Sequence, residues 1–187
     1  MMALPLIVCL EGGIAAGKTT VFNVLKQLHP DWVFLPEPVE SWTNWSDGQN
    51  WLQNFYDDPR KNALSFQKVV LESYTGLKRP FDNGKVCVSE RSPRVATYVF
   101  TPLCVELGYV TAEDCSQLQV QYEKDFALLR LLNPRTVYLK TPANLSFQQL
   151  RKRGRPEEEL VTPAYVQRLN YFHDKEFCDP ENDYIID

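Results

Sequence analysis

A glycine-rich segment near the start of the chain constrains the fold more than any other stretch. Residues 11–20 read EGGIAAGKTT, and they complete the pattern G-x-x-x-x-G-K-[ST]. An apolar run at 4–10 precedes the segment, and a helical pattern at 21–28 follows it. Glycines let the backbone turn tightly, so that several N–H groups point at one phosphate next to a helix N-terminus. The segment therefore predicts a nucleoside-triphosphate site between a strand and a helix.

Two side chains of this phosphate loop carry specific expectations. Lys18 is placed to reach the outer phosphates, and the hydroxyl of Thr19 is placed to occupy one position on Mg²⁺. The residues expected to contact phosphate are Gly12, Gly13, Ile14, Ala15, Ala16, Gly17, Lys18, Thr19 and Thr20.

Apolar runs alternate with helical patterns along the rest of the chain. This alternation predicts an α/β fold with a parallel sheet and right-handed crossovers, built as one domain over residues 1–187. The segment 37–42 is expected to be a loop because it contains proline. Strands are expected at 4–10, 32–35, 86–89, 136–139 and 184–186, and helices at 21–28, 50–56, 62–77, 95–100, 112–132, 142–151 and 163–177.

The composition excludes several functional classes. A net charge of -4 argues against a protein that coats nucleic acid, because such domains are usually strongly basic. No apolar run is long enough to span a bilayer, and no signal or transit peptide precedes the first expected strand. The five cysteines show no C-x-x-C spacing, and there are two histidines, so a zinc site is not expected. We expect reduced thiols and a cytoplasmic location.

Polar residues follow the second and third expected strands directly. Ligands of parallel sheets bind at the carboxyl ends of the strands, where Glu37, Glu90 and Arg91 would join the phosphate loop. The Glu37 carboxylate is suited to orient and deprotonate a hydroxyl, and Glu90 to hold Mg²⁺ directly or through water. Arg91 is suited to neutralise a phosphoryl group in transfer. The alternatives are a surface acid and a local ion pair, and position after a strand favours function.

The segment 151–155 is basic and is followed by an acidic run that ends at Glu159. A basic run alone usually indicates a solvated face or a nucleic-acid patch. Its place after the fourth strand and its helix is where a P-loop kinase carries a lid, and lid arginines stabilise charge in phosphoryl transfer.

One expected helix carries a candidate base-recognition face. Gln67, Val70 and Tyr74 fall on the same side of this helix, and the glutamine amide matches the edge of a nucleobase. Aromatic residues on helices more often belong to a core, so the residues alone favour core packing over base recognition. The aromatic residues expected nearby are Trp42, Tyr56 and Phe100.

Taken in order, the segments GGIAAGKTT, EPVESW, SFQ, SERS and RKRGRPEE resemble the deoxyribonucleoside kinase family over nearly the whole chain. The resemblance implies a P-loop kinase fold with a five-stranded parallel sheet flanked by helices and a lid at about 151–159. It also implies a homodimer formed through helix packing. The implied reaction is Mg²⁺-dependent transfer of the γ-phosphoryl of ATP to the 5′-hydroxyl of a deoxynucleoside.

The resemblance also assigns roles to individual residues. Glu37 corresponds to the base that activates the sugar 5′-hydroxyl, and Gln67 to the glutamine that binds the nucleobase. The remaining assignments are Trp42 and Phe100 around the base, Tyr56 and Glu158 at the 3′-hydroxyl, Arg91 and Lys18 at the reacting phosphate, Glu90 with Thr19 at the metal, and Arg153 and Arg155 as lid arginines.

The chain departs from parts of the family pattern. The segment 92–97 lacks the Asp-Arg pair that relatives favouring purines or cytidine place beside the base. The small Ala96 resembles the thymidine-accepting members and leaves room for a 5-methyl group, whereas Tyr74 is bulkier than expected and would narrow the pocket. We therefore expect a preference for pyrimidines, thymidine in particular.

Two other functions agree less well with the sequence. A nucleoside monophosphate kinase, or a kinase of another small metabolite, needs arginines near Glu37 for an anionic acceptor, and residues 36–45 contain none. A non-catalytic nucleotide-binding module or switch would need a threonine loop and a metal-binding aspartate after a strand, and neither is evident.

Overall fold

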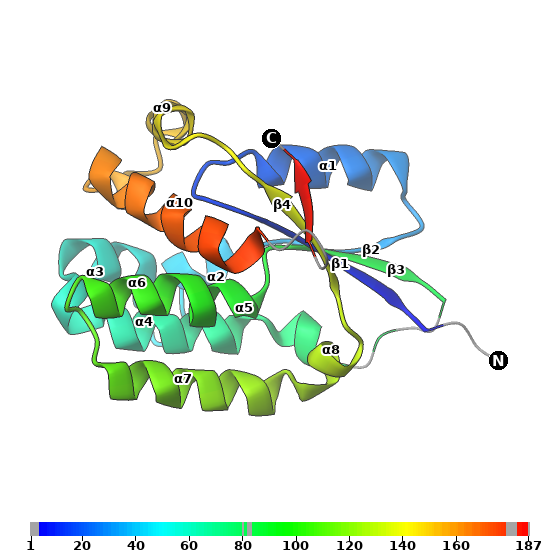
Figure 1. The fold of residues 1–187 in the computed structure, drawn as a ribbon, viewed down its shortest axis with the longest axis horizontal. Coiled ribbons are helices and arrows are strands. Elements are labelled where there is room, and N and C mark those ends of the chain that lie inside the picture. Colours follow the sequence, from blue (N-terminus) through cyan, green and yellow to red (C-terminus); the bar gives the residue numbers. More distant parts are fainter. Residues whose placement is uncertain (1–3, 80, 82–83, 179–182, 187) are drawn as a thin grey trace.

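The computed structural model describes residues 4–79, 81, 84–178 and 183–186 (Figure 1). Its strands are β1 Leu6–Gly12, β2 Val33–Leu35, β3 Val86–Glu90, β4 Arg135–Leu139 and β5 Asp183–Ile186. Its helices are α1 Lys18–Leu28, α2 Val39–Thr43, α3 Trp51–Asp57, α4 Pro59–Ser73, α5 Pro93–Val95, α6 Thr101–Glu106, α7 Ala112–Asp125, α8 Ala127–Leu131, α9 Ala143–Arg153 and α10 Pro163–Phe177. Single-turn 3₁₀ segments lie at η1 Thr75–Lys78 and η3 Pro156–Glu158, and a π-helical turn lies at η2 Ala96–Phe100.

The five strands form one parallel sheet in the order β2-β3-β1-β4-β5, which confirms the expected α/β fold. β1 is central, and its register pairs Leu10 with Glu90 of β3 and Gly12 with Leu139 of β4. Because all the strands run the same way, their carboxyl ends share one edge of the sheet. The phosphate loop, the segment after β2 and the segment after β3 therefore meet there.

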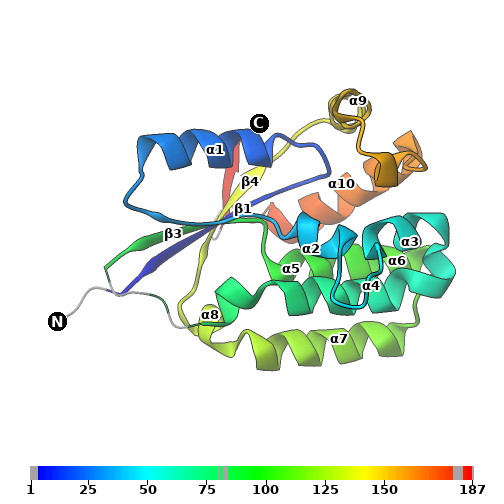
Figure 2. The ribbon, with the colours of Figure 1, turned by 180° about the vertical axis from the view of Figure 1, so that it is seen from behind.

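Helices cover both faces of the sheet. Figures 1 and 2 show α1 on one face and the group formed by α3, α4, α6 and α7 on the other. The side chains of β1 alternate accordingly: Leu10 packs with Phe22 of α1, whereas Ile7 and Cys9 belong to the core beneath the larger helical group. A strand covered on both faces is apolar almost throughout, which explains the long apolar run in the sequence.

Two expected boundaries on the way to the site are wrong, and proline chemistry explains both. The segment 37–42, expected as a loop, contains the start of α2 because Pro38 occupies the N-cap position, where a helix needs no backbone N–H. The next long helix begins before the expected residue 62. Asp58 caps α4 by accepting from the backbone N–H of Lys61, and Pro59 is the first helical residue.

The long helix expected at 112–132 is instead two helices. Phe126 interrupts it with backbone angles φ −115° and ψ 25°, and its ring is 1% exposed in the core. The helix expected at 95–100 contains the π-turn η2, in which the N–H of Thr101 bonds to the carbonyl of Ala96. Pro102, which has no N–H to continue an α-helical ladder, follows directly.

Among the described residues, no helix combines the length and the hydropathy needed to cross a lipid bilayer.

The capping box of α7 offers a test of the local folding argument. Thr111 accepts from the N–H of Asp114, and the Asp114 carboxylate accepts from the N–H of Thr111. Thr111→Ala should lower the free energy of unfolding by about 1 kcal/mol, because the N–H of Asp114 loses its hydroxyl acceptor. Thr111→Ser keeps a hydroxyl and should change stability by a few tenths of that value. Urea unfolding with an unchanged m-value measures both, and equal losses in the two variants would contradict the capping role.

Candidate active site

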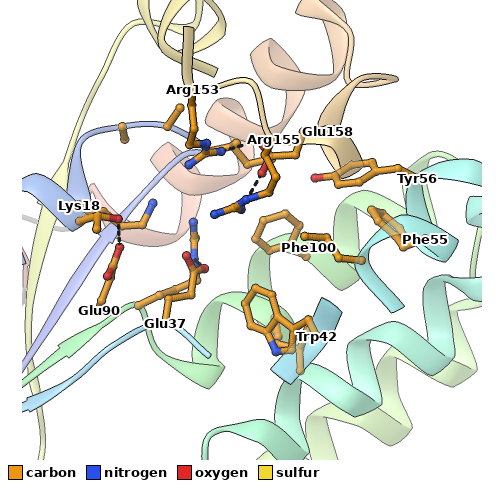
Figure 3. Close-up of a pocket in the computed structure, with 18 of the residues that line it drawn as sticks. Lys18, Glu37, Trp42, Phe55, Tyr56, Glu90, Phe100, Arg153, Arg155 and Glu158 are labelled. Carbon is orange, nitrogen blue, oxygen red and sulfur yellow. Dashed lines mark hydrogen bonds and ion pairs between the residues drawn. The ribbon is translucent and has the colours of Figure 1, made fainter. Parts of the chain in front are cut away.

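A cavity of about 230 Å³ lies at the carboxyl edge of the sheet. Figure 3 shows Lys18 and Glu90 at one end of it, Trp42 and Phe55 toward the other, and Glu37 between the two ends. The expected site residues that line it are Ile14, Ala15, Ala16, Gly17, Lys18, Thr19, Thr20, Glu37, Trp42, Tyr56, Gln67, Val70, Glu90, Arg91, Ala96, Phe100, Arg153, Arg155 and Glu158.

The phosphate loop holds its lysine by backbone contacts. The ammonium of Lys18 donates to the carbonyl oxygens of Gly12, at 3.1 Å, and Gly13, at 2.7 Å. These two glycines do not line the cavity themselves. Burial, followed by the positive charge of Arg91, lowers the pKa of Lys18 to about 7, and the nearby acids Glu37, Glu11 and Glu90 oppose this shift only in part. Additional negative charge at this end of the cavity would raise that pKa again and so favour the ammonium form.

Gly12 is required by the close approach of two strands. Its φ is +153°, and a Cβ at this position would lie 2.8 Å from the carbonyl oxygen of Leu139. The loop that follows starts directly beside β4, and Gly17, with φ +93°, leads the chain into α1. The glycines of the motif thus serve backbone geometry, as the sequence predicts.

Thr19 and Glu90 bring two oxygen ligands together at the phosphate end. The hydroxyl of Thr19, in the first turn of α1, donates to Oε1 of Glu90 at the end of β3 (Figure 3). Mg²⁺ prefers oxygen ligands and usually keeps several waters, with one or two carboxylates from the protein. Within the described chain no cluster of three acidic, histidine or cysteine side chains is arranged to hold a metal. The pair therefore fits a Mg²⁺ ion that is bound mainly by phosphates and water.

Glu37 and Arg91 form an ion pair where β2 and β3 end. Nε of Arg91 donates to Oε1 of Glu37 at 2.5 Å, and Nη1 donates to the carbonyl oxygen of Gly12 at 3.1 Å. Burial raises the pKa of Glu37, but the charges of Arg91 and Lys18 outweigh burial and leave this pKa below its usual value. Glu37 is therefore ionised at neutral pH and able to accept a proton.

The other end of the cavity is apolar apart from one amide. Gln67 of α4 is 2% exposed, and its Oε1 atom has no hydrogen-bond partner among the described residues. Phe66 and Val70 flank it along the helix, and the indole N–H of Trp42 donates to the hydroxyl of Ser73, which fixes that ring. A buried acceptor without a partner is costly, and a ligand that donates to it would remove the cost.

The expected lid residues converge on one carboxylate. Nη2 of Arg153 lies 2.6 Å from one oxygen of Glu158, and Nη1 of Arg155 lies 2.9 Å from the other. Both arginines and Glu158 face the cavity, and the hydroxyl of Tyr56 points toward Glu158 (Figure 3). Burial and the charge of Glu158 raise the pKa of Tyr56, so its phenol remains protonated.

Tyr74 departs from the expected arrangement. It caps the C-terminus of α4 instead of continuing the face formed by Gln67 and Val70, and it is not among the residues that line the cavity. Its ring is 4% exposed in the core, because the helix ends at Ser73 and the chain turns there. The expected narrowing of the pocket by Tyr74 therefore has no support in the geometry.

The structure adds residues that the sequence reasoning did not assign. Glu11 and His173 are both 0% exposed and lie in the charged cluster around Arg91 and Lys18. Glu11 is the one charged residue within the otherwise apolar strand β1, and the sequence already shows this unusual position. His173 is distant in sequence from Arg91, and no sequence pattern indicates that the two residues are in contact. Further residues that line the cavity are Leu52, Phe55, Phe66 and Gln149.

Comparisons with known proteins agree with this geometry. The family described as deoxynucleoside kinase matches residues 8–180. A thymidine kinase of Ictalurid herpesvirus 1 is 32% identical, over 88% of this chain and 71% of its own length. The putative kinase protein 029R of Invertebrate iridescent virus 3 is 28% identical, over 97% and 87% of the respective lengths. Deoxycytidine kinase of Homo sapiens is 28% identical, over 89% and 73%.

The burial of Glu11 predicts a pH-dependent stability. Burial raises its pKa from 4.5 to about 7, and Arg91, Ser92 and Lys18 oppose this only in part. Between these values the folded chain keeps a proton that the unfolded chain releases, so Glu11 lowers stability as the pH rises through this window. Glu11→Gln removes the effect. The stability of the variant relative to the wild type should rise by up to about 3 kcal/mol between about pH 4.5 and pH 7.5. Urea unfolding at several pH values measures this, and a constant difference would contradict it.

Proposed function

Because this chain belongs to the deoxynucleoside kinase family, an ATP-dependent class of enzymes, we propose that its acceptor is the 5′-hydroxyl of a pyrimidine deoxynucleoside, thymidine above all. The observation that carries the proposal is the position of Glu37. Its ionised carboxylate lies between the phosphate loop and the apolar half of the cavity (Figure 3). A hydroxyl bound beside it is therefore close to a triphosphate bound at Lys18.

Glu37 is the proposed general base. It accepts the proton of the 5′-hydroxyl as the oxygen attacks the γ-phosphorus, and the ion pair with Arg91 fixes the direction of its carboxylate. Arg91 itself lines the cavity and places positive charge beside the reacting oxygens. The pair therefore combines proton removal with charge stabilisation at one point.

The phosphate donor occupies the other half of the cavity. Backbone N–H groups of the loop and the ammonium of Lys18 bind its phosphates, and Arg153 and Arg155 approach from the lid. We propose Mg²⁺ as cofactor, held by Thr19 and Glu90, where it would neutralise charge on the phosphates.

The nucleoside fills the apolar half. The amide of Gln67 offers an acceptor without a partner and a donor, which match the N3–H and a carbonyl of thymine. Trp42 and Phe100 bound the ring, and Tyr56 with Glu158 takes the 3′-hydroxyl. Relatives include both deoxycytidine kinases and a thymidine kinase, so the proposed preference for thymidine rests on the small Ala96 and on the lack of an Asp-Arg pair in residues 92–97.

We also propose a homodimer formed by helix packing. The helices α7 and α8 lie on the outside of the larger helical layer, and they expose Val120 and Leu131 at 67% and 81%. Association of two copies through this layer would remove such side chains from water.

A direct assay tests the acceptor. The purified chain is incubated with ATP, Mg²⁺ and each of the four common deoxynucleosides, deoxyuridine or thymidine 5′-monophosphate, and products are separated and quantified. We expect thymidine 5′-monophosphate to form with the highest kcat/KM of the unphosphorylated acceptors. Phosphorylation of the monophosphate alone would instead identify a nucleoside monophosphate kinase, and no product with any acceptor would reject this proposal.

Replacement of the proposed general base, Glu37, should lower turnover without weakening the binding of thymidine. Glu37→Gln keeps the size of the side chain but cannot take the proton, so kcat should fall by roughly 10²- to 10⁴-fold, while the Kd for thymidine changes little. Glu40→Gln, which removes an exposed carboxylate from the short helix α2 that follows Glu37, is the matched control and should retain activity. Steady-state kinetics and calorimetric titration measure the two quantities. Unchanged turnover in Glu37→Gln would dismiss Glu37 as the base.

The space beside Ala96 gives a test of base preference. Ala96→Val adds volume where a 5-methyl group is expected, so kcat/KM for thymidine should fall about tenfold more than kcat/KM for deoxyuridine, which lacks only that methyl. The ratio of kcat/KM for thymidine to kcat/KM for deoxyuridine cancels any general loss of activity from overpacking at this buried position. Equal losses for both nucleosides would show that Ala96 does not face the methyl group.

A further inference from the structure

A buried histidine contacts the guanidinium of Arg91. Nε2 of His173, on α10, lies 3.3 Å from Nη1 of Arg91, and Nδ1 lies 2.9 Å from the carbonyl oxygen of Leu169 one turn earlier. The ring is 0% exposed and packs among three aromatic rings at centroid distances of 6.1 to 6.4 Å. These rings belong to Phe100, Tyr138 and Phe177.

The two contacts determine the tautomer of His173. A guanidinium only donates, so Nε2 must present a lone pair to Arg91. A carbonyl oxygen only accepts, so Nδ1 must carry the hydrogen that points to Leu169. Burial, followed by the charge of Arg91, lowers the pKa of His173 well below its usual value, so the ring stays neutral and keeps this lone pair.

This contact completes one edge of the guanidinium. Nε of Arg91 is occupied by Glu37, and the two hydrogens of Nη1 are occupied by the carbonyl of Gly12 and by His173. Among the described residues Nη2 has no hydrogen-bond partner, and Arg91 lines the cavity. The geometry thus leaves one nitrogen, with two hydrogens, available for a ligand oxygen.

The backbone of Arg91 is also in an unusual conformation. Its φ is +65°, a left-handed conformation that a residue with a long side chain adopts only when its surroundings impose it. Bonds from the backbone N–H to the carbonyl of Leu10, and from the Ser89 hydroxyl to the Arg91 carbonyl, hold the main chain. His173 and Gly12 then hold the far end of the side chain.

We propose that His173 is a positioning residue, whose Nε2 lone pair orients the guanidinium of Arg91 so that Nη2 faces the transferring phosphoryl group. This inference rests on the proposed role of Arg91 in the reaction. The competing explanation is a core histidine that serves packing alone. The two explanations predict different turnover in a variant that keeps a flat ring at position 173 but lacks the Nε2 lone pair.

Two substitutions separate the lone pair from the ring. His173→Phe keeps a flat ring among its aromatic neighbours but offers no acceptor, so kcat should fall about tenfold to a hundredfold with the KM for thymidine nearly unchanged. His173→Gln places an amide oxygen near the position of Nε2 and should recover most of that loss. Full activity of His173→Phe, or equal losses in both variants, would overturn the proposal.

Phe177→Leu is the matched control for packing. It disturbs the same aromatic cluster without contacting Arg91, so it should lower the melting temperature while kcat stays within about twofold. A loss of kcat in Phe177→Leu as large as that in His173→Phe would assign the effect to packing and reject the positioning role.

A double-mutant cycle tests whether His173 acts through Arg91. In an Arg91→Lys background, His173→Phe should cost no more than about twofold in kcat, because the guanidinium that it orients is absent. If His173→Phe lowers kcat by the same factor in the Arg91→Lys background as in the wild type, the proposal is contradicted.

A spectroscopic measurement keeps the test independent of turnover. ¹⁵N NMR of the wild type should show the Nδ1–H tautomer with Nε2 hydrogen-bonded, and the Nε2 shift should move in Arg91→Lys. A protonated Nε2 would reject the contact even if the enzyme were inactive on thymidine. Conversely, the expected shifts without thymidine turnover would reject the proposed substrate and leave the contact standing.

Discussion

The ion pair between Glu37 and Arg91 joins the ends of β2 and β3, and the rest of the site is arranged around it. Burying two charges costs several kcal/mol per ion, so such a pair persists only where hydrogen bonds satisfy both partners. Here the carbonyl of Gly12 and the imidazole of His173 accept from the two hydrogens of Nη1 of Arg91. The pair is thus coupled to the phosphate loop on β1 and to α10, and three distant parts of the chain fix one carboxylate.

Charges of both signs lie close together around this pair. Lys18 and Arg91 are buried together with Glu11 and Glu90 and lie beside the half-buried Glu37, so each cation has acids nearby. Burial moves Lys18 and Glu11 toward their neutral forms, whereas Arg91 keeps Glu37 ionised. The same environment therefore leaves one carboxylate protonated over part of the neutral range and another ready to accept a proton, as acid–base chemistry at neutral pH requires.

Much of this architecture was predictable because its signals are local. The motif around Lys18 lies between an apolar strand and a helix, and the position of Glu37 and Arg91 after strands predicts their convergence in a parallel sheet. Helix boundaries were less predictable, since Pro38 caps a helix in a segment expected as a loop, and Pro59 starts α4 before the expected residue 62. Tyr74 and Phe126 show the same limit, because the fold ends or interrupts a helix where periodicity alone continues it. The role of His173 could not be predicted from the sequence, since its contact with Arg91 joins residues 82 positions apart and leaves no local pattern.

The two arginines that share the carboxylate of Glu158 give the segment after α9 a further property. A sugar hydroxyl that donates to this carboxylate competes with the guanidinium groups for its oxygens, and it alters how firmly Arg153 and Arg155 are held. If a sugar bound at Glu158 changes the affinity of the site for a triphosphate by some factor, the bound triphosphate must change the affinity for the sugar by the same factor. On the proposed binding mode, the two halves of the cavity are therefore energetically linked through Glu158, and the affinity of each half for its ligand depends on whether the other half is filled.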